Sequence, residues 1–104
     1  MKKGKVFFHP IEGTGPLTIS WTSGPKGDAV EAKKGAGVGF FSENGDLLSV
    51  IFDEVQFPED DQTLEFSSDR VEITLKNGRV TYLLSKLKKN PVRRKKSVKR
   101  RLPA

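Results

Sequence analysis

Cysteine is absent from this 104-residue chain, and histidine, tryptophan, tyrosine and methionine each occur only once. Without cysteine there is no disulfide, no thiolate zinc site and no cysteine nucleophile. No apolar run approaches the length of a membrane span, which is about 18 residues. The basic N-terminus is not followed by the apolar segment that an export signal requires. We therefore expect a protein that stays where it is made, in the cytoplasm, or in the nucleus if the source is eukaryotic, without contacting a membrane.

Side chains that commonly perform catalysis are scarce. His9 is the sole histidine and is followed by Pro10 at an expected strand end. A general base needs a partner within hydrogen-bond reach, and the sequence indicates none, so we expect a surface or edge histidine. With one histidine, a zinc site would depend on carboxylates or water, an uncommon combination. We assign no catalytic, metal-ligating or cofactor-binding residue and expect that the protein is not an enzyme.

Acidic residues are missing from the C-terminal end of the chain. Overall, 19 Lys and Arg residues exceed 13 Asp and Glu residues, for a formal charge of +6. From residue 86 onward there are ten basic residues and no acidic one. The first 85 residues consequently carry a net charge of −4. The basic residues of this segment are Lys86, Lys88, Lys89, Arg93, Arg94, Lys95, Lys96, Lys99, Arg100 and Arg101.

The same segment has too few apolar residues to form a core. Between Asn90 and Ala104 only four aliphatic residues occur, and Pro91 and Pro103 interrupt them. Such a segment cannot bury enough apolar surface to offset its ordering entropy. We therefore expect an all-β domain over residues 1–87 and a basic tail over residues 88–104 that is disordered or partly helical.

Alternation of apolar and polar residues dominates the first 85 residues, as is typical of half-buried β-strands. The alternation is clearest in Leu17–Thr22, Val71–Leu75 and Val80–Leu84. The run Leu47–Asp53 is apolar on both faces, which indicates a central strand. The remaining expected strands are Lys5–His9, Asp28–Lys33, Val38–Ser42 and Thr63–Phe66.

Turn-forming residues separate these runs. Asn44-Gly45 and Asn77-Gly78 each stand between alternating strands, where Asn-Gly favours a two-residue type I′ hairpin. The other expected turns are Gly13–Pro16, Ser23–Gly27 and Phe57–Asp61. Seven to eight short antiparallel strands at this spacing predict an all-β fold, namely a small sandwich, a roll or a partly open barrel.

One segment fits two structures. Val80, Leu83, Leu84 and Leu87 match the spacing of a helical face as well as that of a strand. The Asn-Gly turn directly before them favours the strand, and the chain is free to become helical after Leu84.

Residues 17–55 follow a recognisable order. An alternating strand, a Gly-containing turn and a strand with charged residues (Asp28–Lys34) precede a Gly-Val strand (Gly37–Ser42), an Asn-Gly turn and an aliphatic strand ending at Asp53-Glu54. This order resembles the small bacterial β-domain family called domain of unknown function 2283, which implies an all-β fold and a prokaryotic origin. The chain has Phe41-Ser42 where that family usually has an aspartate. No catalytic residue follows from the resemblance.

Two local patterns have both a functional and a structural interpretation. Gly35–Gly39 resembles a phosphate-binding loop, but the helix that such a loop requires does not follow, so we expect a flexible strand connection or a bulge. An acidic cluster lies around Pro58, without the spacing of a calcium loop. We expect a solvated loop there, with metal binding or attraction of the basic tail as alternatives. The cluster comprises Asp53, Glu54, Glu59, Asp60 and Asp61.

The nine aromatic residues are needed mainly for the core of so small a domain, although exposed ones could stack nucleobases. Phe7-Phe8 and Phe40-Phe41 differ from the rest, because neighbours on a strand face opposite sides of a sheet. One phenylalanine of each pair must therefore be covered by a second layer or by a partner.

The basic segment has the most functional content. Lysine and arginine neutralise phosphates, and the Arg93-Arg94 and Arg100-Arg101 pairs add bidentate geometry. We expect a nucleic-acid-associated accessory protein that binds the phosphate backbone of DNA or RNA without sequence specificity. The alternative is a protein-interaction or regulatory module, an antitoxin-like companion whose acidic β body binds a protein. A solubilising terminus, a nuclear-import signal, lipid docking and binding of an acidic protein also fit the basic segment.

Overall fold

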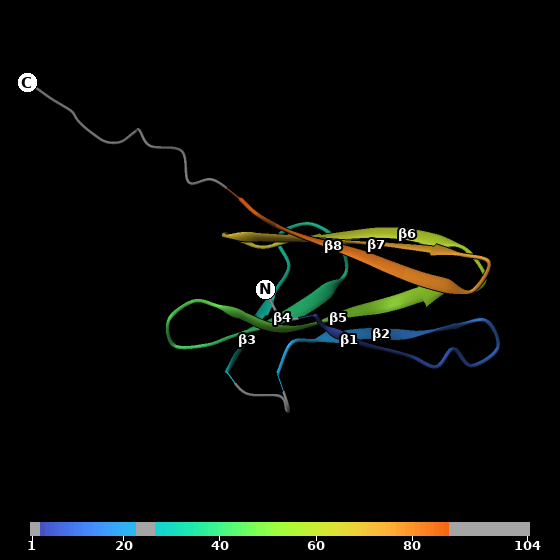
Figure 1. The fold of residues 1–104 in the computed structure, drawn as a ribbon, viewed down its shortest axis with the longest axis horizontal. Helices are drawn as coiled ribbons and strands as arrows, with labels where there is room; N and C mark the ends of the chain where they lie inside the picture. The colour runs from blue at the N-terminus through green and yellow to red at the C-terminus, as the bar shows by residue number, and fades with distance from the viewer. Residues whose placement is uncertain (1–2, 23–26, 88–104) are drawn as a thin grey trace, which may run out of the picture.

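The computed structural model describes residues 3–22 and 27–87. This part of the chain contains eight strands and no helix. The strands are β1 (Lys5–Phe8), β2 (Thr14–Ser20), β3 (Asp28–Glu31), β4 (Gly37–Phe41), β5 (Leu47–Gln56), β6 (Asp60–Glu65), β7 (Asp69–Lys76) and β8 (Arg79–Lys86). They form two antiparallel sheets, with orders β1-β2-β5-β4-β3 and β6-β7-β8, that lie face to face (Figure 1). The predicted all-β fold is confirmed, and its form is a sandwich.

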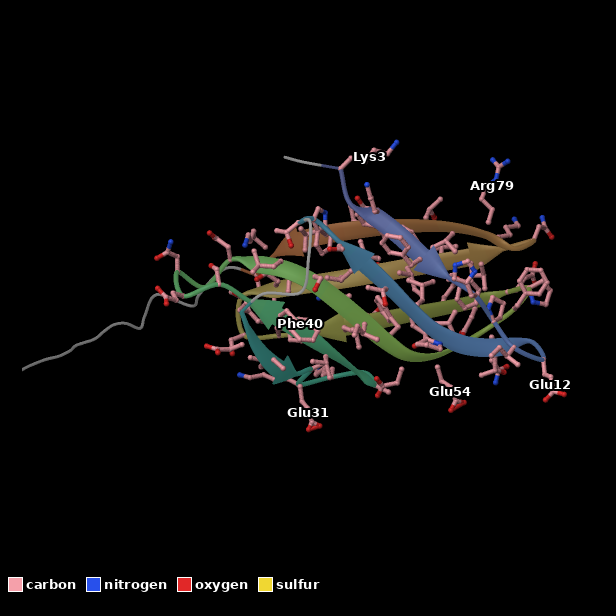
Figure 2. The ribbon with its side chains drawn as sticks, turned by 90° about the horizontal axis from the view of Figure 1, so that it is seen from below. Lys3, Glu12, Glu31, Phe40, Glu54 and Arg79 are labelled. Carbon is pink, nitrogen blue, oxygen red and sulfur yellow. The ribbon has the colours of Figure 1, made fainter. Side chains whose placement is uncertain are left out.

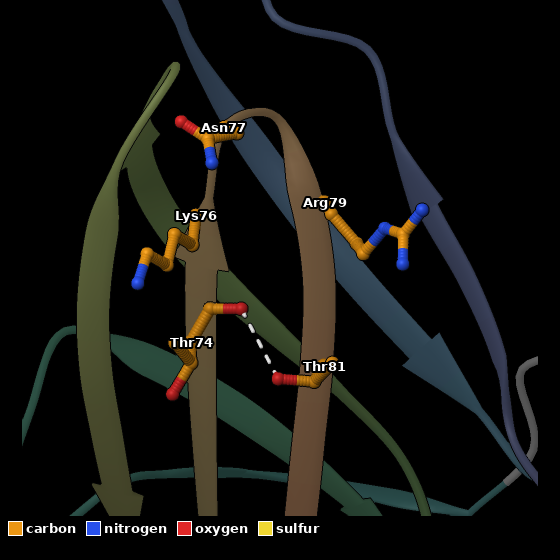
Figure 3. A pocket seen from close by; sticks show the side chains of 5 residues that line it. All are labelled: Thr74, Lys76, Asn77, Arg79 and Thr81. Atoms are coloured by element: carbon orange, nitrogen blue, oxygen red, sulfur yellow. Dashed lines mark hydrogen bonds between the residues drawn. The ribbon is translucent and has the colours of Figure 1, made fainter.

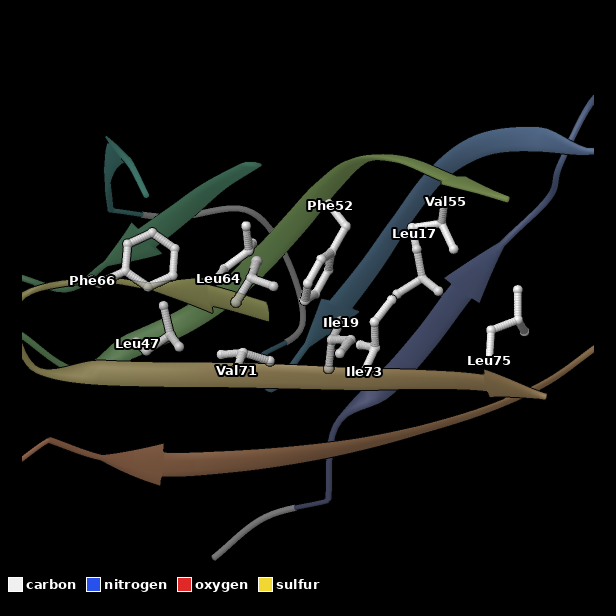
Figure 4. Close-up of a cluster of buried hydrophobic side chains, with 11 residues drawn as sticks. Leu17, Ile19, Leu47, Phe52, Val55, Leu64, Phe66, Val71, Ile73 and Leu75 are labelled. Carbon is white, nitrogen blue, oxygen red and sulfur yellow. The ribbon is translucent and has the colours of Figure 1, made fainter. Parts of the chain in front are cut away.

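The core lies between the two sheets (Figure 4). Alternate residues of β2, β5 and β7 point into it, as strand periodicity requires. Because apolar burial contributes about 25 cal/mol per Å², this layer is the main source of stability. The core residues are Leu17, Ile19, Leu47, Val50, Phe52, Val55, Leu64, Phe66, Val71, Ile73 and Leu75.

The strand predicted to be central is central. β5 lies between β2 and β4 in the middle of the five-stranded sheet. Val50 and Phe52 on its inner face are fully buried, whereas Ile51 on its outer face is half-buried. On the outer face Ile51 lies between Ser49 and Asp53, and no second layer covers it within the described residues.

The hairpin between β7 and β8 has the predicted geometry. Lys76 pairs with Arg79, which leaves a two-residue loop, and both Asn77 (φ 54°) and Gly78 (φ 79°) adopt the left-handed conformation of a type I′ turn. β8 continues to Lys86. The prediction of a strand for this segment is therefore confirmed, and the helical alternative is wrong.

The turn between β4 and β5 differs from the prediction. Only Gly45 (φ 86°) has a positive φ, so Asn44-Gly45 is not a type I′ pair. The loop has three residues, closed by hydrogen bonds from Ser42 N to Asp46 O (2.9 Å) and from Gly45 N to Ser42 O (2.9 Å). The Ser42 hydroxyl accepts from the amides of Asn44 (3.2 Å) and Asp46 (3.1 Å). This side chain stabilises the longer loop, as Ser commonly does in turns.

The turn predicted at Gly13–Pro16 lies two residues earlier. Glu12 (φ 54°) and Gly13 (φ 84°) form it, and Ile11 and Thr14 exchange two backbone hydrogen bonds across it. Gly15 already belongs to β2. A Cβ atom there would lie 3.1 Å from the Cα of Pro10, so close backbone packing, not a turn, requires that glycine.

Other predicted boundaries shift by a few residues. β6 begins at Asp60, inside the predicted Phe57–Asp61 turn. β3 ends at Glu31, two residues early, because the chain leaves the sheet there and Lys33 N donates to Glu65 O of β6 (2.7 Å). Most of the predicted Ser23–Gly27 turn lies outside the described residues.

Candidate nucleic-acid interface

Of the ten predicted nucleic-acid-binding residues, only Lys86 is among the described residues. It ends β8, and its Nζ lies 2.8 Å from Oδ1 of Asp69, a fully buried carboxylate on β7. The Ser68 hydroxyl donates to the other oxygen, Oδ2 (2.6 Å). The residues outside the described part are Lys88, Lys89, Arg93, Arg94, Lys95, Lys96, Lys99, Arg100 and Arg101.

The Lys86–Asp69 ion pair belongs to the fold. Oδ1 of Asp69 accepts no hydrogen bond within the described residues, and the Lys86 ammonium is its one charged contact there. Lys86 therefore compensates the buried charge at this oxygen. A buried carboxylate without compensation is strongly unfavourable. One residue later, Leu87 N donates to Ser68 O (2.8 Å). Lys86 therefore has a structural task that the sequence pattern does not indicate.

Two other cations are carried by the tip of the β7–β8 hairpin. Lys76 and Arg79 are register partners, and with Thr74, Asn77 and Thr81 they line an open pocket on the outer face of the three-stranded sheet (Figure 3). Among residues 3–22 and 27–87, neither cation forms an ion pair with a carboxylate. The Thr81 hydroxyl is directed at the carbonyl oxygen of Thr74 (3.5 Å). Figure 3 shows the Lys76 and Arg79 side chains extending to opposite sides of the hairpin.

Acidic side chains lie on the β6 side of this hairpin tip and further along the same face. Asp61 of β6 is the register partner of Thr74, and further along the same face Arg70 pairs with Glu65 (3.2 Å) and Glu72 (3.5 Å). The described residues contain eight Lys and Arg against 13 Asp and Glu. The β body is thus acidic overall, and Lys76 and Arg79 form a small positive region within it.

The acidic cluster around Pro58 is mostly exposed, as predicted, but it is not a loop: Asp53 and Glu54 belong to β5, Asp60 and Asp61 belong to β6, and only Glu59 lies in the connection. Its one partly buried member, Asp60, accepts hydrogen bonds through Oδ2 from Gln56 N (3.0 Å) and Gln62 Nε2 (2.8 Å). The Gln56 contact holds the start of β6 against the end of β5. Within the described ranges, no three His, Asp or Glu side chains come together as a metal site would require.

The glycine-rich segment is a strand connection, as predicted, and not a phosphate-binding loop. Gly35 (φ 89°) makes the turn, and β4 begins at Gly37. Cβ atoms on Gly37 and Gly39 would lie 2.6 Å from Leu64 Cδ1 and 2.8 Å from Phe66 Cζ, respectively. These glycines therefore admit the side chains of the opposite sheet. His9 follows β1 and is exposed, as expected for an edge residue.

The paired aromatic residues divide between the two faces of the five-stranded sheet. Phe8 packs against the core, and Phe41 makes an edge-to-face contact with Phe66 at 5.4 Å between ring centroids. Phe7 is 50% exposed and Phe40 is half-buried on the outer face, which Figure 2 views from below. The core accounts for Phe8, Trp21, Phe41, Phe52, Phe66 and Tyr82.

No family model matches the chain, and neither a curated protein nor a solved structure matches it. The resemblance of residues 17–55 to domain of unknown function 2283 stays a prediction; in the structure these residues contribute β2, β3, β4 and β5, four neighbouring strands of one sheet. Over the described residues, no helix is long and apolar enough to cross a membrane.

Proposed function

We propose that this protein is a non-enzymatic, nucleic-acid-associated accessory protein whose basic tail binds the phosphate backbone without sequence specificity. The observation that carries the proposal is the separation of charge along the chain. Residues 88–104 contain nine cations and no acid, whereas the described residues have five more acidic than basic side chains. A polyanion is attracted to the first segment and repelled by most of the second.

Lysine and arginine bind phosphates by releasing condensed counterions, and this interaction does not depend on base sequence. We assign the contact to the nine tail cations and leave out Lys86, whose charge compensates Asp69. Lys76 and Arg79 are the described cations best placed to add a contact, because neither is held by a carboxylate among the described residues.

Fluorescence anisotropy with a labelled duplex and a labelled single strand tests the proposal. The full-length chain is compared with a full-length variant in which all nine tail cations are glutamine. Lys33→Gln/Lys34→Gln is the control, because it removes two exposed charges from the β body. We expect the full-length protein to bind with a log–log salt slope of roughly −4 to −8.

The nine-glutamine variant should lose this binding, and the control should retain it. Equal binding by all three proteins would place the contact on the β body and contradict the proposal. Absence of binding by the full-length protein near physiological salt would contradict it as well.

The alternative function is a protein-interaction or regulatory module. The acidic charge of the described β body favours it, because such a surface attracts a basic partner. An oligolysine peptide tests this alternative on the nine-glutamine variant. Binding that is abolished by Asp53→Asn/Glu59→Gln/Asp61→Asn would support this module. Failure of the peptide to bind would leave the β body without that role.

A further inference from the structure

The outer face of the five-stranded sheet carries an apolar strip, which we define as Phe7, Val38, Phe40 and Ile51. Strand register places these residues together: Phe7, Thr18, Ile51 and Val38 are successive partners across β1, β2, β5 and β4. Phe40 lies in the neighbouring row, opposite Ser49. Figure 2 looks onto this face and shows Phe40 on it.

The strip is more apolar than a solvated face requires. An antiparallel sheet with one face in water normally alternates apolar and polar residues. β5 follows this alternation, with Ser49, Ile51 and Asp53 outward, but Ile51 is apolar and β4 places Val38 and Phe40 beside it. None of the described residues forms a layer over this face, and Phe7 is 50% exposed. Val38, Phe40 and Ile51 adjoin one another and are half-buried, and Thr18 separates them from Phe7. Apolar side chains gathered on an uncovered sheet face favour an interaction surface.

The charges at the two edges of this face indicate the partner. Lys5 on β1 and Glu31 on β3 both lie on the outer side, at opposite edges of the sheet, and β5 runs midway between them. Lys33 and Lys34 follow Glu31 only after the chain has left the sheet toward Glu65. A face with an apolar centre and opposite charges at its edges is complementary to its own copy.

We propose that the apolar strip binds the same face of a second copy of this chain, with the two-fold axis running along β5. This axis places β1 of one copy over β3 of the other. Lys5 then lies over Ala29, two residues (about 7 Å) along the strand from Glu31, so that the long Lys5 side chain reaches toward Glu31 at both edges. An axis across the strands would instead bring Lys5 near Lys5 and Glu31 near Glu31. Two-fold dimers with isologous contacts of this kind are the commonest homo-oligomers.

The size of the face sets the strength of the contact. Five strands spaced about 4.8 Å apart, covered over about four residues each, give a footprint of roughly 24 by 14 Å on each copy. This is below the value of about 800 Å² per partner in a standard interface. We therefore expect a weak dimer, populated at high micromolar concentration.

Stacking of nucleobases on Phe7 and Phe40 is the competing use of this face. Glu31 and Asp53 lie on the same side, and the β body is acidic overall. A phosphate backbone would be repelled there. A second copy brings Lys5 toward each Glu31, which a nucleic acid does not, whereas Asp53 on β5 lies near its own copy and weakens the dimer. The two Lys5 contacts are what favour a second copy over a nucleic acid.

Sedimentation velocity of the full-length protein tests the dimer, without nucleic acid, over roughly 5 to 500 µM, the range for a small interface. Phe40→Ser should raise the dissociation constant at least about tenfold, because it removes one of the two aromatic rings of the strip. Leu83→Ser is the matched control: Leu83 is 59% exposed on the outer face of the other sheet. Circular dichroism and urea unfolding establish that both variants are folded.

Charge reversal tests the axis. Lys5→Glu and Glu31→Lys should each weaken the dimer. The double variant should restore it, because the glutamate at position 5 of one copy then faces the lysine at position 31 of the other. A protein that stays monomeric throughout the range overturns the proposal, as does an equal effect of Leu83→Ser. The proposal is also overturned if Phe40→Ser lowers single-strand affinity but leaves sedimentation unchanged. Loss of nucleic-acid binding in the nine-glutamine variant would not affect this result.

Discussion

At the scale of single residues, the two glycines of β4 set how closely the sheets approach. Gly39 faces Phe66, which is 2% exposed, and a Cβ atom on Gly39 would lie 2.8 Å from Phe66 Cζ and 2.9 Å from Cε1. The Phe66 ring is also fixed from the side by Phe41. The ring therefore has little freedom to yield, and the small residue is a packing requirement.

Gly39→Ala should lower the free energy of unfolding by about 1–3 kcal/mol, the usual range for overpacking a core. Urea unfolding measures the change. In the double variant with Phe66→Leu the ring is gone, so the loss should be smaller than the sum of the two single losses. Additive losses would show that Phe66 does not meet the new methyl group.

Lys86 and Lys88 are neighbours in the basic segment but differ in role. Lys86→Gln leaves the buried Asp69 carboxylate without its cation, and we expect a loss of about 1–3 kcal/mol in unfolding free energy. The Lys86 side chain is 62% exposed, so water limits the loss. Lys88→Gln should leave stability unchanged but reduce the salt slope of nucleic-acid binding by up to about 0.9. Urea unfolding and anisotropy measure the two effects, and equal slopes for both variants would contradict this division.

At the scale of elements, three tight turns show what local sequence determines. Asn77-Gly78 is predictable because both residues tolerate a positive φ. Glu12-Gly13 adopts similar backbone angles, but glutamate is not a turn signal, so the pattern does not indicate it. Asn44-Gly45 has the signal without the geometry, because Ser42 supplies competing hydrogen bonds. Turn type therefore depends on neighbours that a dipeptide rule omits.

The candidate interfaces are predictable to different degrees. The charge of the basic segment is evident from composition, and the two phenylalanine pairs indicate that both faces of the sheet carry aromatic rings. The Lys86–Asp69 pair is not predictable, because it depends on the register between β7 and β8. The two edge charges on one face likewise depend on strand order, which places β5 between β2 and β4.

Two turn glycines offer a matched test of element geometry. A Cβ atom on Gly45 (φ 86°) would meet nothing within 4 Å, whereas a Cβ atom on Gly78 (φ 79°) would lie 2.6 Å from Cε2 of the Phe57 ring. Gly45→Ala should cost about 1–2 kcal/mol from the left-handed backbone alone. Gly78→Ala should cost more by about 1 kcal/mol, because Phe57 must also move. Thermal or urea unfolding gives both values, and Phe57→Ala should remove the difference; equal costs would show that the ring yields freely.

At the scale of the whole molecule, charge and apolar surface lie in different places. The chain carries +6 overall although its described part has more acidic than basic residues. Two copies therefore repel each other as whole molecules while their apolar strips attract. Nucleic-acid binding and self-association should therefore respond to salt in opposite directions.

Raising the salt concentration should weaken nucleic-acid binding, because the release of condensed counterions into concentrated salt is less favourable. The same change should strengthen self-association of the full-length protein, because the Debye length falls from about 10 Å at 0.1 M to 3 Å at 1 M and screens the +6 charges from each other. The Lys5–Glu31 contacts lie at the rim, where ion pairs contribute little, so their screening should not reverse the trend. Replacing the nine tail cations with glutamine changes the formal charge from +6 to −3 and should reduce the salt dependence of sedimentation. A dimer that weakens steeply with salt in both proteins would mean that ion pairs, not the apolar strip, hold the copies together.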